Sequence, residues 1–127
     1  KIMKREIKFR AWDIPAKKYR GVDGLKDLFS IRSDGFFNED YVLEQFTGLK
    51  DKNGVDIYEG DILSKGKISK RPSWKKGHDY YCVSFSNGVF VANGYNGEFK
   101  VSPILHNLNS GCEIIGNIHE NPELLNN

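Results

Sequence analysis

Apolar and polar side chains alternate along much of this chain, and that alternation predicts short β-strands. In the segment REIKFRAWD, Ile7, Phe9 and Ala11 fall on one face of an extended backbone, while charged residues and a tryptophan fall on the other. The segment is therefore expected to form a half-buried strand. After a turn that contains Pro15, residues 19–22 are expected to return as its hairpin partner.

Further strands are predicted between turn signals that are rich in asparagine and glycine. Asn87-Gly88 is typical of a tight hairpin turn, and Asn93-Gly94 with Asn96-Gly97 marks the next expected reversal. The period-two pattern places the other strands near residues 41–46, 55–57, 61–64, 81–85, 89–92, 99–101 and 112–118.

Helix signals are few. Residues 23–40 fit either a short helix or another hairpin. Asn121-Pro122-Glu123 predicts a helix of one or two turns, with the asparagine as its cap and the proline at the first helical position.

The resulting class is mostly β with little helix. The strand count and turn spacing between residues 58 and 118 predict a small SH3-like barrel in the C-terminal half, with an N-terminal β-hairpin packed on it. We expect a single domain over residues 1–127, divided into an N-terminal hairpin region (1–46) and a barrel-like region (47–127).

Composition narrows the cellular setting. The 127 residues contain no apolar run of membrane-spanning length, and the N-terminus lacks the apolar region of a secretory signal. The two cysteines, Cys82 and Cys112, have no CxxC partner, so we expect reduced thiols in a cytosolic protein.

The net charge of +2 conceals strongly charged blocks. Residues 1–20 carry eight Lys/Arg and two acids, and residues 21–63 carry ten acids and four Lys/Arg. Residues 64–78 carry six Lys/Arg and no acid, and residues 79–127 carry five acids and one lysine. Such blocks favour attraction within the fold or between subunits, or a basic face that binds nucleic acid.

The basic block 64–78 shows no apolar period and is expected to form a long exposed loop. Its side chains combine charges that neutralise phosphates with a tryptophan that can stack on an unpaired base. Two other interpretations stay open, namely a solvated loop whose tryptophan folds back onto the barrel, and a subunit contact with an acidic block. Lys4, Arg5, Lys8 and Arg10 would extend the same basic face if the fold places them beside it. The candidate nucleic-acid-binding residues are Lys65, Lys67, Lys70, Arg71, Trp74, Lys75 and Lys76.

The acidic stretch TGLKDKNGVDIYEGDIL does not fit the pattern of a cation-binding loop. Counted from Asp51, the EF-hand pattern fails at Val55, Asp56 and Ile62, so the stretch is interpreted as a hairpin turn followed by strands. Asp51 is expected to serve the turn by bonding its own backbone. Asp56, Glu59 and Asp61 flank strand ends, where they are expected to stay solvated or to cap free backbone N–H groups. The four acids are not expected to form a catalytic cluster.

The sequence also contains weak patterns for a zinc site and for a metal-dependent nuclease. The pairs His78/Cys82 and His106/Cys112 match no compact zinc spacing, so no metal site is predicted. Glu98-Phe99-Lys100 with Asp79 upstream resembles the D…(D/E)xK pattern of metal-dependent nucleases, but Asp79 lacks the usual preceding proline. No Gly-rich phosphate loop or nucleophile motif is present, so no catalytic residue and no cofactor are predicted.

Three sequence blocks resemble the YopX family of phage and prophage proteins. They are REIKFRAWD near the start, QFTGLKDKNGVDIYEGDIL in the middle and EIIGNIHENPELL at the end, in the family's order. The resemblance implies a small, mostly β protein that is encoded by a phage or prophage and acts in the bacterial cytoplasm. It implies no established activity, so no functional residue is transferred.

These observations predict a non-enzymatic protein that binds a partner and does not bind a membrane. The leading partner is DNA or RNA, bound through residues 65–76. The alternative is a protein–protein adaptor or homo-oligomer whose partner is a phage or host protein, and a further alternative is a metal-dependent nuclease.

Overall fold

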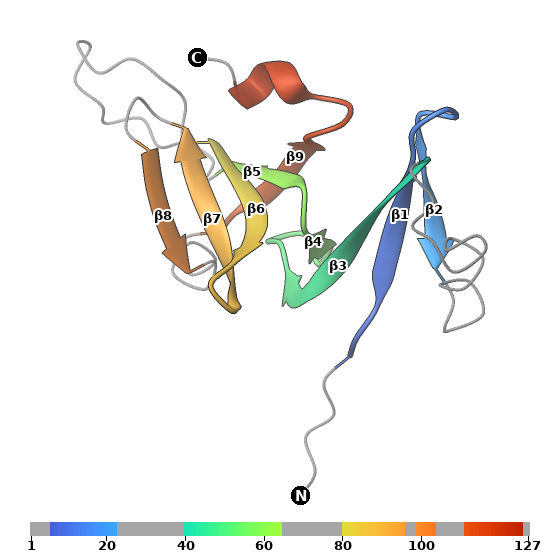
Figure 1. The fold of residues 1–127 in the computed structure, drawn as a ribbon. Helices are drawn as coiled ribbons and strands as arrows, with labels where there is room; N and C mark the ends of the chain where they lie inside the picture. The colour runs from blue at the N-terminus through green and yellow to red at the C-terminus, as the bar shows by residue number, and fades with distance from the viewer. Residues whose placement is uncertain (1–5, 23–39, 65–79, 96–98, 104–110, 126–127) are drawn as a thin grey trace, which may run out of the picture.

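Two antiparallel β-sheets form the molecule (Figure 1). The structure, a computed structural model, describes residues 6–22, 40–64, 80–95, 99–103 and 111–125. The strands are β1 (Phe9–Asp13), β2 (Lys18–Val22), β3 (Tyr41–Lys50), β4 (Asp56–Tyr58), β5 (Asp61–Ser64), β6 (Tyr80–Ser86), β7 (Val89–Tyr95), β8 (Phe99–Pro103) and β9 (Glu113–Asn117).

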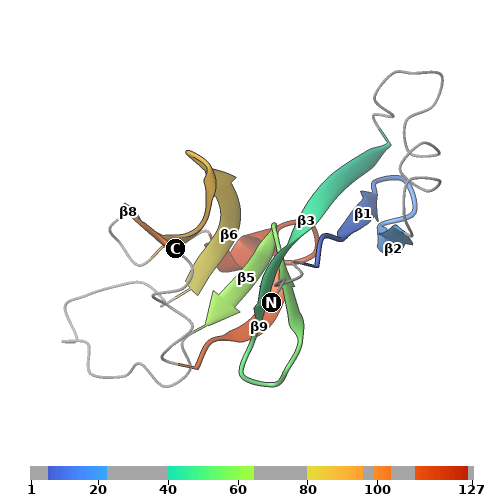
Figure 2. The ribbon, with the colours of Figure 1, turned by 90° about the horizontal axis from the view of Figure 1, so that it is seen from below.

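The N-terminal sheet has the strand order β2-β1-β3-β4. Strand β1 lies between β2 and β3, and Asp13 at its end pairs with Lys18 on one side and Tyr41 on the other. The ten-residue strand β3 runs from the β1–β2 hairpin to the second sheet (Figure 2). It is the element that connects the two halves of the molecule.

The C-terminal sheet has the order β8-β7-β6-β5-β9 and curls into a half-barrel. Its central hairpin turns at Asn87 and Gly88, whose φ angles of 52° and 83° fit a type I′ turn. This predicted turn is confirmed. Asn93-Gly94, however, lies inside β7, so the predicted reversal at that pair is wrong, and Asn96-Gly97 lies outside the described residues.

The core of the half-barrel is small and apolar. Ile57, Leu63, Val83 and Cys112 pack together, and each is at most 1% exposed. Cys82 precedes Val83 in β6 and therefore points to the opposite face of the strand, away from Cys112. Neither cysteine forms a disulfide.

The predicted fold class is confirmed, because the described chain is mostly β and its C-terminal sheet forms a half-barrel. The expected helix is a single 3-10 turn, Pro122–Leu125. The side chain of Asn121 accepts a hydrogen bond from the Asn117 N–H at the end of β9, and its carbonyl accepts one from the Leu124 N–H of the turn. The predictions for residues 23–39 and 65–79 lie outside the described residues.

The first strand differs from its predicted half-buried state. Ala11 is 1% exposed and Trp12 is 6% exposed although they lie on opposite faces of β1. Both faces of the strand are therefore covered at its centre. Among the described residues, no helix is long and apolar enough to cross a membrane.

Candidate functional site: a buried charged junction

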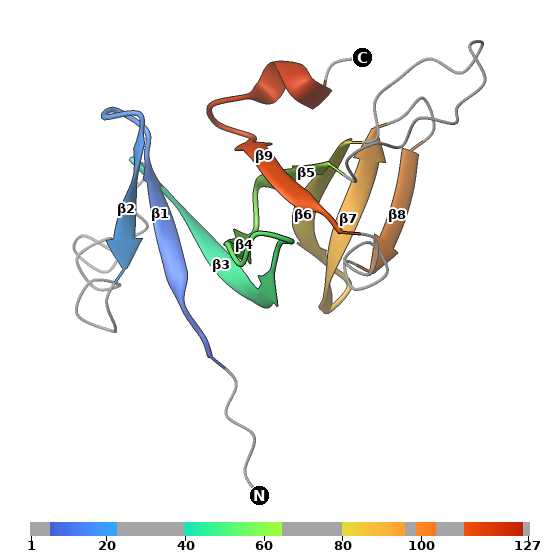
Figure 3. The same ribbon diagram turned by 180° about the vertical axis from the view of Figure 1, so that it is seen from behind.

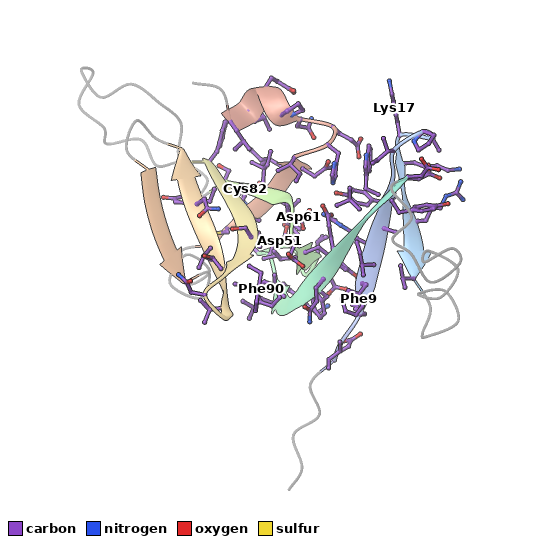
Figure 4. The ribbon with its side chains drawn as sticks, viewed as in Figure 1. Phe9, Lys17, Asp51, Asp61, Cys82 and Phe90 are labelled. Atoms are coloured by element: carbon purple, nitrogen blue, oxygen red, sulfur yellow. The ribbon has the colours of Figure 1, made fainter. Side chains whose placement is uncertain are left out.

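A group of charged and aromatic side chains lies between the two sheets. Figure 4 shows Asp61 in this central position, and Figure 3 shows the turn after β9 reaching towards β1. We call this group the charged junction, and its members are Arg10, Tyr19, Glu44, Asp61 and His119.

Arg10 binds both carboxylates of the junction. Its Nε donates to Glu44 Oε1 at 2.9 Å, and its Nη2 donates to Asp61 Oδ1 at 2.8 Å and to the Glu59 carbonyl at 3.2 Å. The guanidinium carbon lies 3.9 Å from the ring centroid of Tyr19 and 4.8 Å from that of Tyr58. With 17% of its side chain exposed, Arg10 is held by charge, hydrogen bonds and cation–π contacts at once.

Glu44 is the acceptor that links the most segments. It accepts hydrogen bonds from the Tyr19 hydroxyl at 3.0 Å and from Arg10, and His119 Nε2 lies 2.8 Å from its Oε2. The Glu44 carboxylate also lies directly over Gly60, where a Cβ atom would collide with it.

Aromatic stacking completes the junction. The rings of Trp12 and His119 stack with centroids 4.7 Å apart and an interplanar angle of 5°. Trp12 also packs edge-on against Tyr19 at 4.9 Å. The turn after β9 is therefore fixed to the N-terminal sheet by an aromatic contact with β1 and a polar contact with β3.

Burial sets the ionisation of the junction. Burial raises the pKa of Asp61 above its usual value, and the nearby Arg10 charge offsets this only in part. Burial also raises the pKa of Tyr19, so its hydroxyl stays protonated and donates to Glu44. For Arg10, burial disfavours the charged form, but Asp61 and the other partners outweigh it and raise the pKa. Arg10 therefore stays positively charged.

The junction is saturated by its own partners. Among the described residues, no buried side-chain nitrogen or oxygen lacks a hydrogen bond, and no three His, Cys, Asp or Glu side chains gather to hold a metal ion. Such an arrangement orients and locks the sheets relative to each other. It leaves no described acid or histidine of the junction without an internal partner.

The acidic side chains of residues 47–63 also have structural roles, and Asp51 shows this most clearly. Asp51 is 8% exposed and accepts backbone hydrogen bonds from Asn53, Val55 and Ile114, which ties the β3–β4 turn to β9. Burial alone would raise the Asp51 pKa, but these three N–H donors lower it below its usual value. The predicted role of Asp51 in the turn is confirmed by its bonds to Asn53 and Val55.

Glu59 and Asp61 cap backbone N–H groups as expected, those of Gln45 at 2.9 Å and of Tyr58 at 2.8 Å. Asp61 is only 2% exposed. Asp56 departs from the expectation, because it pairs with Lys8 and Lys50, both at 2.6 Å.

Two basic residues of the N-terminal block have acidic partners within the fold. Arg10 lies in the junction, and Lys8 is engaged by Glu6 and Asp56. The suggested extension of a basic face stays a prediction, because the basic segment itself is not described. Lys4 and Arg5 lie outside the described residues, as do Lys65, Lys67, Lys70, Arg71, Trp74, Lys75 and Lys76.

The other chemical candidates are only partly described. His78, His106, Asp79 and Glu98 lie outside the described residues. The nuclease pattern therefore stays an untested alternative.

Sequence reasoning missed the charged junction. Arg10, Asp61 and His119 each come from a different one of the three blocks that carry the family resemblance, and Glu44 immediately precedes the middle block. The sequence signal for this contact was that each of the three blocks contains a charged residue. Their contact could not be read from spacing, because three of the four lie on different strands and the fourth in a turn.

The fold and the junction define a class of small, mostly β proteins in which a hairpin-based sheet is locked onto a half-barrel by buried charges. The family model described as YopX protein matches residues 8–126, nearly the whole chain. The chain therefore belongs to the YopX family.

Comparison with solved structures supports the fold. The chain is similar to the crystal structure of protein EF1440 from Enterococcus faecalis, with 28% sequence identity and a TM-score of 0.58. The match covers 96% of this chain and 99% of that one. No curated protein matches the chain.

Proposed function

We propose that this chain is a non-enzymatic binding module whose partner is a nucleic acid and whose main contact is the segment 65–76. That segment carries six Lys/Arg, no acid and one tryptophan. Its cations suit phosphate neutralisation with counterion release, and its indole suits stacking on an unpaired base. An origin in a phage or prophage and action in the bacterial cytoplasm belong to the same proposal.

The observation that carries the proposal is the internal use of the acidic middle of the chain. Every acid between residues 41 and 63 already accepts hydrogen bonds from the described part of the fold: Glu44, Asp51, Asp56, Glu59 and Asp61. Paired acids have little attraction left for a basic segment, whether in the same subunit or in another. This favours an external polyanion as the partner of residues 65–76.

A second candidate function is a protein–protein adaptor. It is favoured by the hairpin of β6 and β7, where Phe85 and Val89 are 54% and 49% exposed. Two exposed apolar side chains near one turn suit a protein contact better than a phosphate backbone.

The test is fluorescence anisotropy of labelled single- and double-stranded DNA and RNA at two salt concentrations. Reversing the charges of Lys70, Arg71, Lys75 and Lys76 together is expected to abolish binding, and Trp74→Ala to weaken single-strand binding by about 1–3 kcal/mol. Replacing the three lysines by arginine is the matched control, because it keeps the charge and is expected to keep the binding.

The same variants separate the alternatives. Unchanged binding after the charge reversal contradicts the proposal. A change in molecular mass in solution without any nucleic-acid binding favours the adaptor. Cleavage of DNA or RNA that needs Mg²⁺ and is lost in Glu98→Ala favours the nuclease.

A further inference from the structure

The turn between β1 and β2 projects at one end of the N-terminal sheet (Figure 1). It is apolar at its tip: Ile14 is 46% exposed, and Pro15 and Ala16 are exposed beside it. Lys17 and Lys18 follow directly and are exposed. Figure 4 shows the Lys17 side chain pointing away from the rest of the molecule.

The tip is held in one conformation by its own backbone. Asp13 accepts a hydrogen bond from the Ala16 N–H at 3.0 Å through its side chain and from the Lys17 N–H at 2.8 Å through its carbonyl. Lys17 adopts a left-handed φ of 55°, and the Ile14 N–H donates to the Asp40 carbonyl at 2.8 Å. A preorganised tip loses little conformational entropy when it inserts into a partner.

The base of the hairpin is equally rigid. Trp12 and Tyr19 pack edge-on directly below the turn, and Trp12 stacks on His119 of the charged junction. The hairpin below the turn is therefore packed internally and against the turn after β9.

The charges on the hairpin are available to a partner. Arg20 pairs with Asp13 at 2.6 Å, which neutralises both. Within the described residues, neither Lys17 nor Lys18 forms an ion pair. The projecting end therefore carries two exposed lysines that form no ion pair with a described residue, next to an apolar point, and Lys18 lies near enough to Asp13 to help lower the pKa of that carboxyl.

We propose that the β1–β2 tip binds the minor groove of duplex DNA, with Ile14 and Pro15 as a wedge between base steps and Lys17 and Lys18 on the flanking phosphates. Proteins that kink DNA insert small apolar side chains of this kind into the minor groove and neutralise the phosphates beside it. This inference rests on the proposed function, since it adds a second contact to the same nucleic acid that residues 65–76 bind.

The test uses the full chain and an A·T-rich duplex labelled at both ends, so that anisotropy reports binding and energy transfer reports bending. Ile14→Ser is expected to weaken binding about tenfold and to abolish bending, because the wedge loses its apolar contact. Lys17→Gln with Lys18→Gln is expected to lower the slope of log K against log salt concentration by about 2. Val55→Ser is the matched control, since Val55 is 52% exposed and lies beyond the opposite end of β3.

The outcomes separate this inference from the proposed function. Duplex binding by the wild type that is unchanged in all three tip substitutions overturns the tip contact and leaves residues 65–76 as the site. Absence of duplex binding by the wild type overturns the tip contact, and the proposed function is overturned as well only if single-stranded DNA and RNA are not bound either. Binding to vesicles of phosphatidylserine and phosphatidylcholine that Ile14→Ser abolishes, without any effect on DNA, overturns the tip contact in favour of a membrane surface.

Discussion

At the scale of single residues, Arg10 compensates the buried acids Glu44 and Asp61. Arg10→Met keeps most of the aliphatic stem but leaves two buried carboxylates without a positive charge. We expect a loss of about 3–5 kcal/mol in the free energy of unfolding, measured by urea titration.

Arg20→Met is the control for this substitution. Arg20 also pairs with an acid of the N-terminal sheet, but 49% of its side chain is exposed. Water replaces much of what an exposed pair provides, so the expected loss is much smaller. Equal losses in the two variants would contradict the role assigned to the charged junction.

Gly60 gives a second prediction at this scale. Its φ of 85° is unfavourable for any side chain, and the Glu44 carboxylate occupies the place of a Cβ atom. Gly54 has a similar φ of 81° but open space around it. Thermal unfolding should therefore show Gly54→Ala to cost about 1–2 kcal/mol from backbone strain alone, and Gly60→Ala to cost clearly more. A Gly60→Ala cost no larger than that of Gly54→Ala would mean that Glu44 moves aside freely.

The residue scale is where the sequence predicted least. Alternation assigned Arg10 to a polar, solvated face of its strand, yet that face is the one pressed against the half-barrel. Its partners Glu44 and Asp61 lie 34 and 51 residues away. Periodicity reports which side chains share a face, but it cannot report which distant strand covers that face.

At the scale of elements, Asp51 joins the β3–β4 turn to β9. Asp51→Ala is expected to cost about 3 kcal/mol, since three backbone N–H groups lose a charged acceptor. Asp51→Asn is expected to cost less, because its amide oxygen still accepts from Asn53 and Val55.

The pH dependence of the same residue has a defined sign. A carboxyl whose folded pKa is lowered stabilises the fold above its ordinary value of 3.8, and this contribution is lost as the pH falls through the folded pKa. The stability difference between wild type and Asp51→Asn should therefore shrink below about pH 4 in urea unfolding. A difference that stays constant down to about pH 2 would contradict the lowered pKa.

Most elements could be predicted because local signals and tertiary structure agree. Asn87-Gly88 supplies the left-handed backbone that its turn requires, and the strands on either side alternate. Asn93-Gly94 carries the same local signal inside β7, which pairs with β6 on one side and β8 on the other. Two ladders of hydrogen bonds outweigh the turn preference of one dipeptide.

At the scale of the whole molecule, Glu44 couples the two sheets. Glu44→Ala removes the acceptor shared by Arg10, Tyr19 and His119. In a Trp74→Phe background, Trp12 fluorescence reports the N-terminal sheet and far-ultraviolet circular dichroism reports the strands of both sheets. We expect the two unfolding curves to coincide in this background and to separate when Glu44→Ala is added, with the fluorescence change first. Coincident curves in both proteins would show that the sheets stay coupled without Glu44.

The mostly β class and the barrel-like C-terminal half could be predicted from the sequence. The contacts that join the two sheets could not. Turn spacing and strand count predicted a mostly β chain with a barrel-like C-terminal half, because these features are local and repeated. The junction depends on five single residues brought together by topology. The single-domain division and the role of residues 65–76 remain predictions.

The junction also sets the order of events during protein synthesis. Glu44 and His119 are 75 residues apart, so at typical elongation rates roughly 4–15 s separate their addition to the chain. Until His119 has left the ribosome, Trp12 lacks the ring that stacks on it, and Glu44 lacks one of its side-chain partners. The N-terminal sheet can therefore be fixed to the turn after β9 only once the whole segment between them has been synthesised.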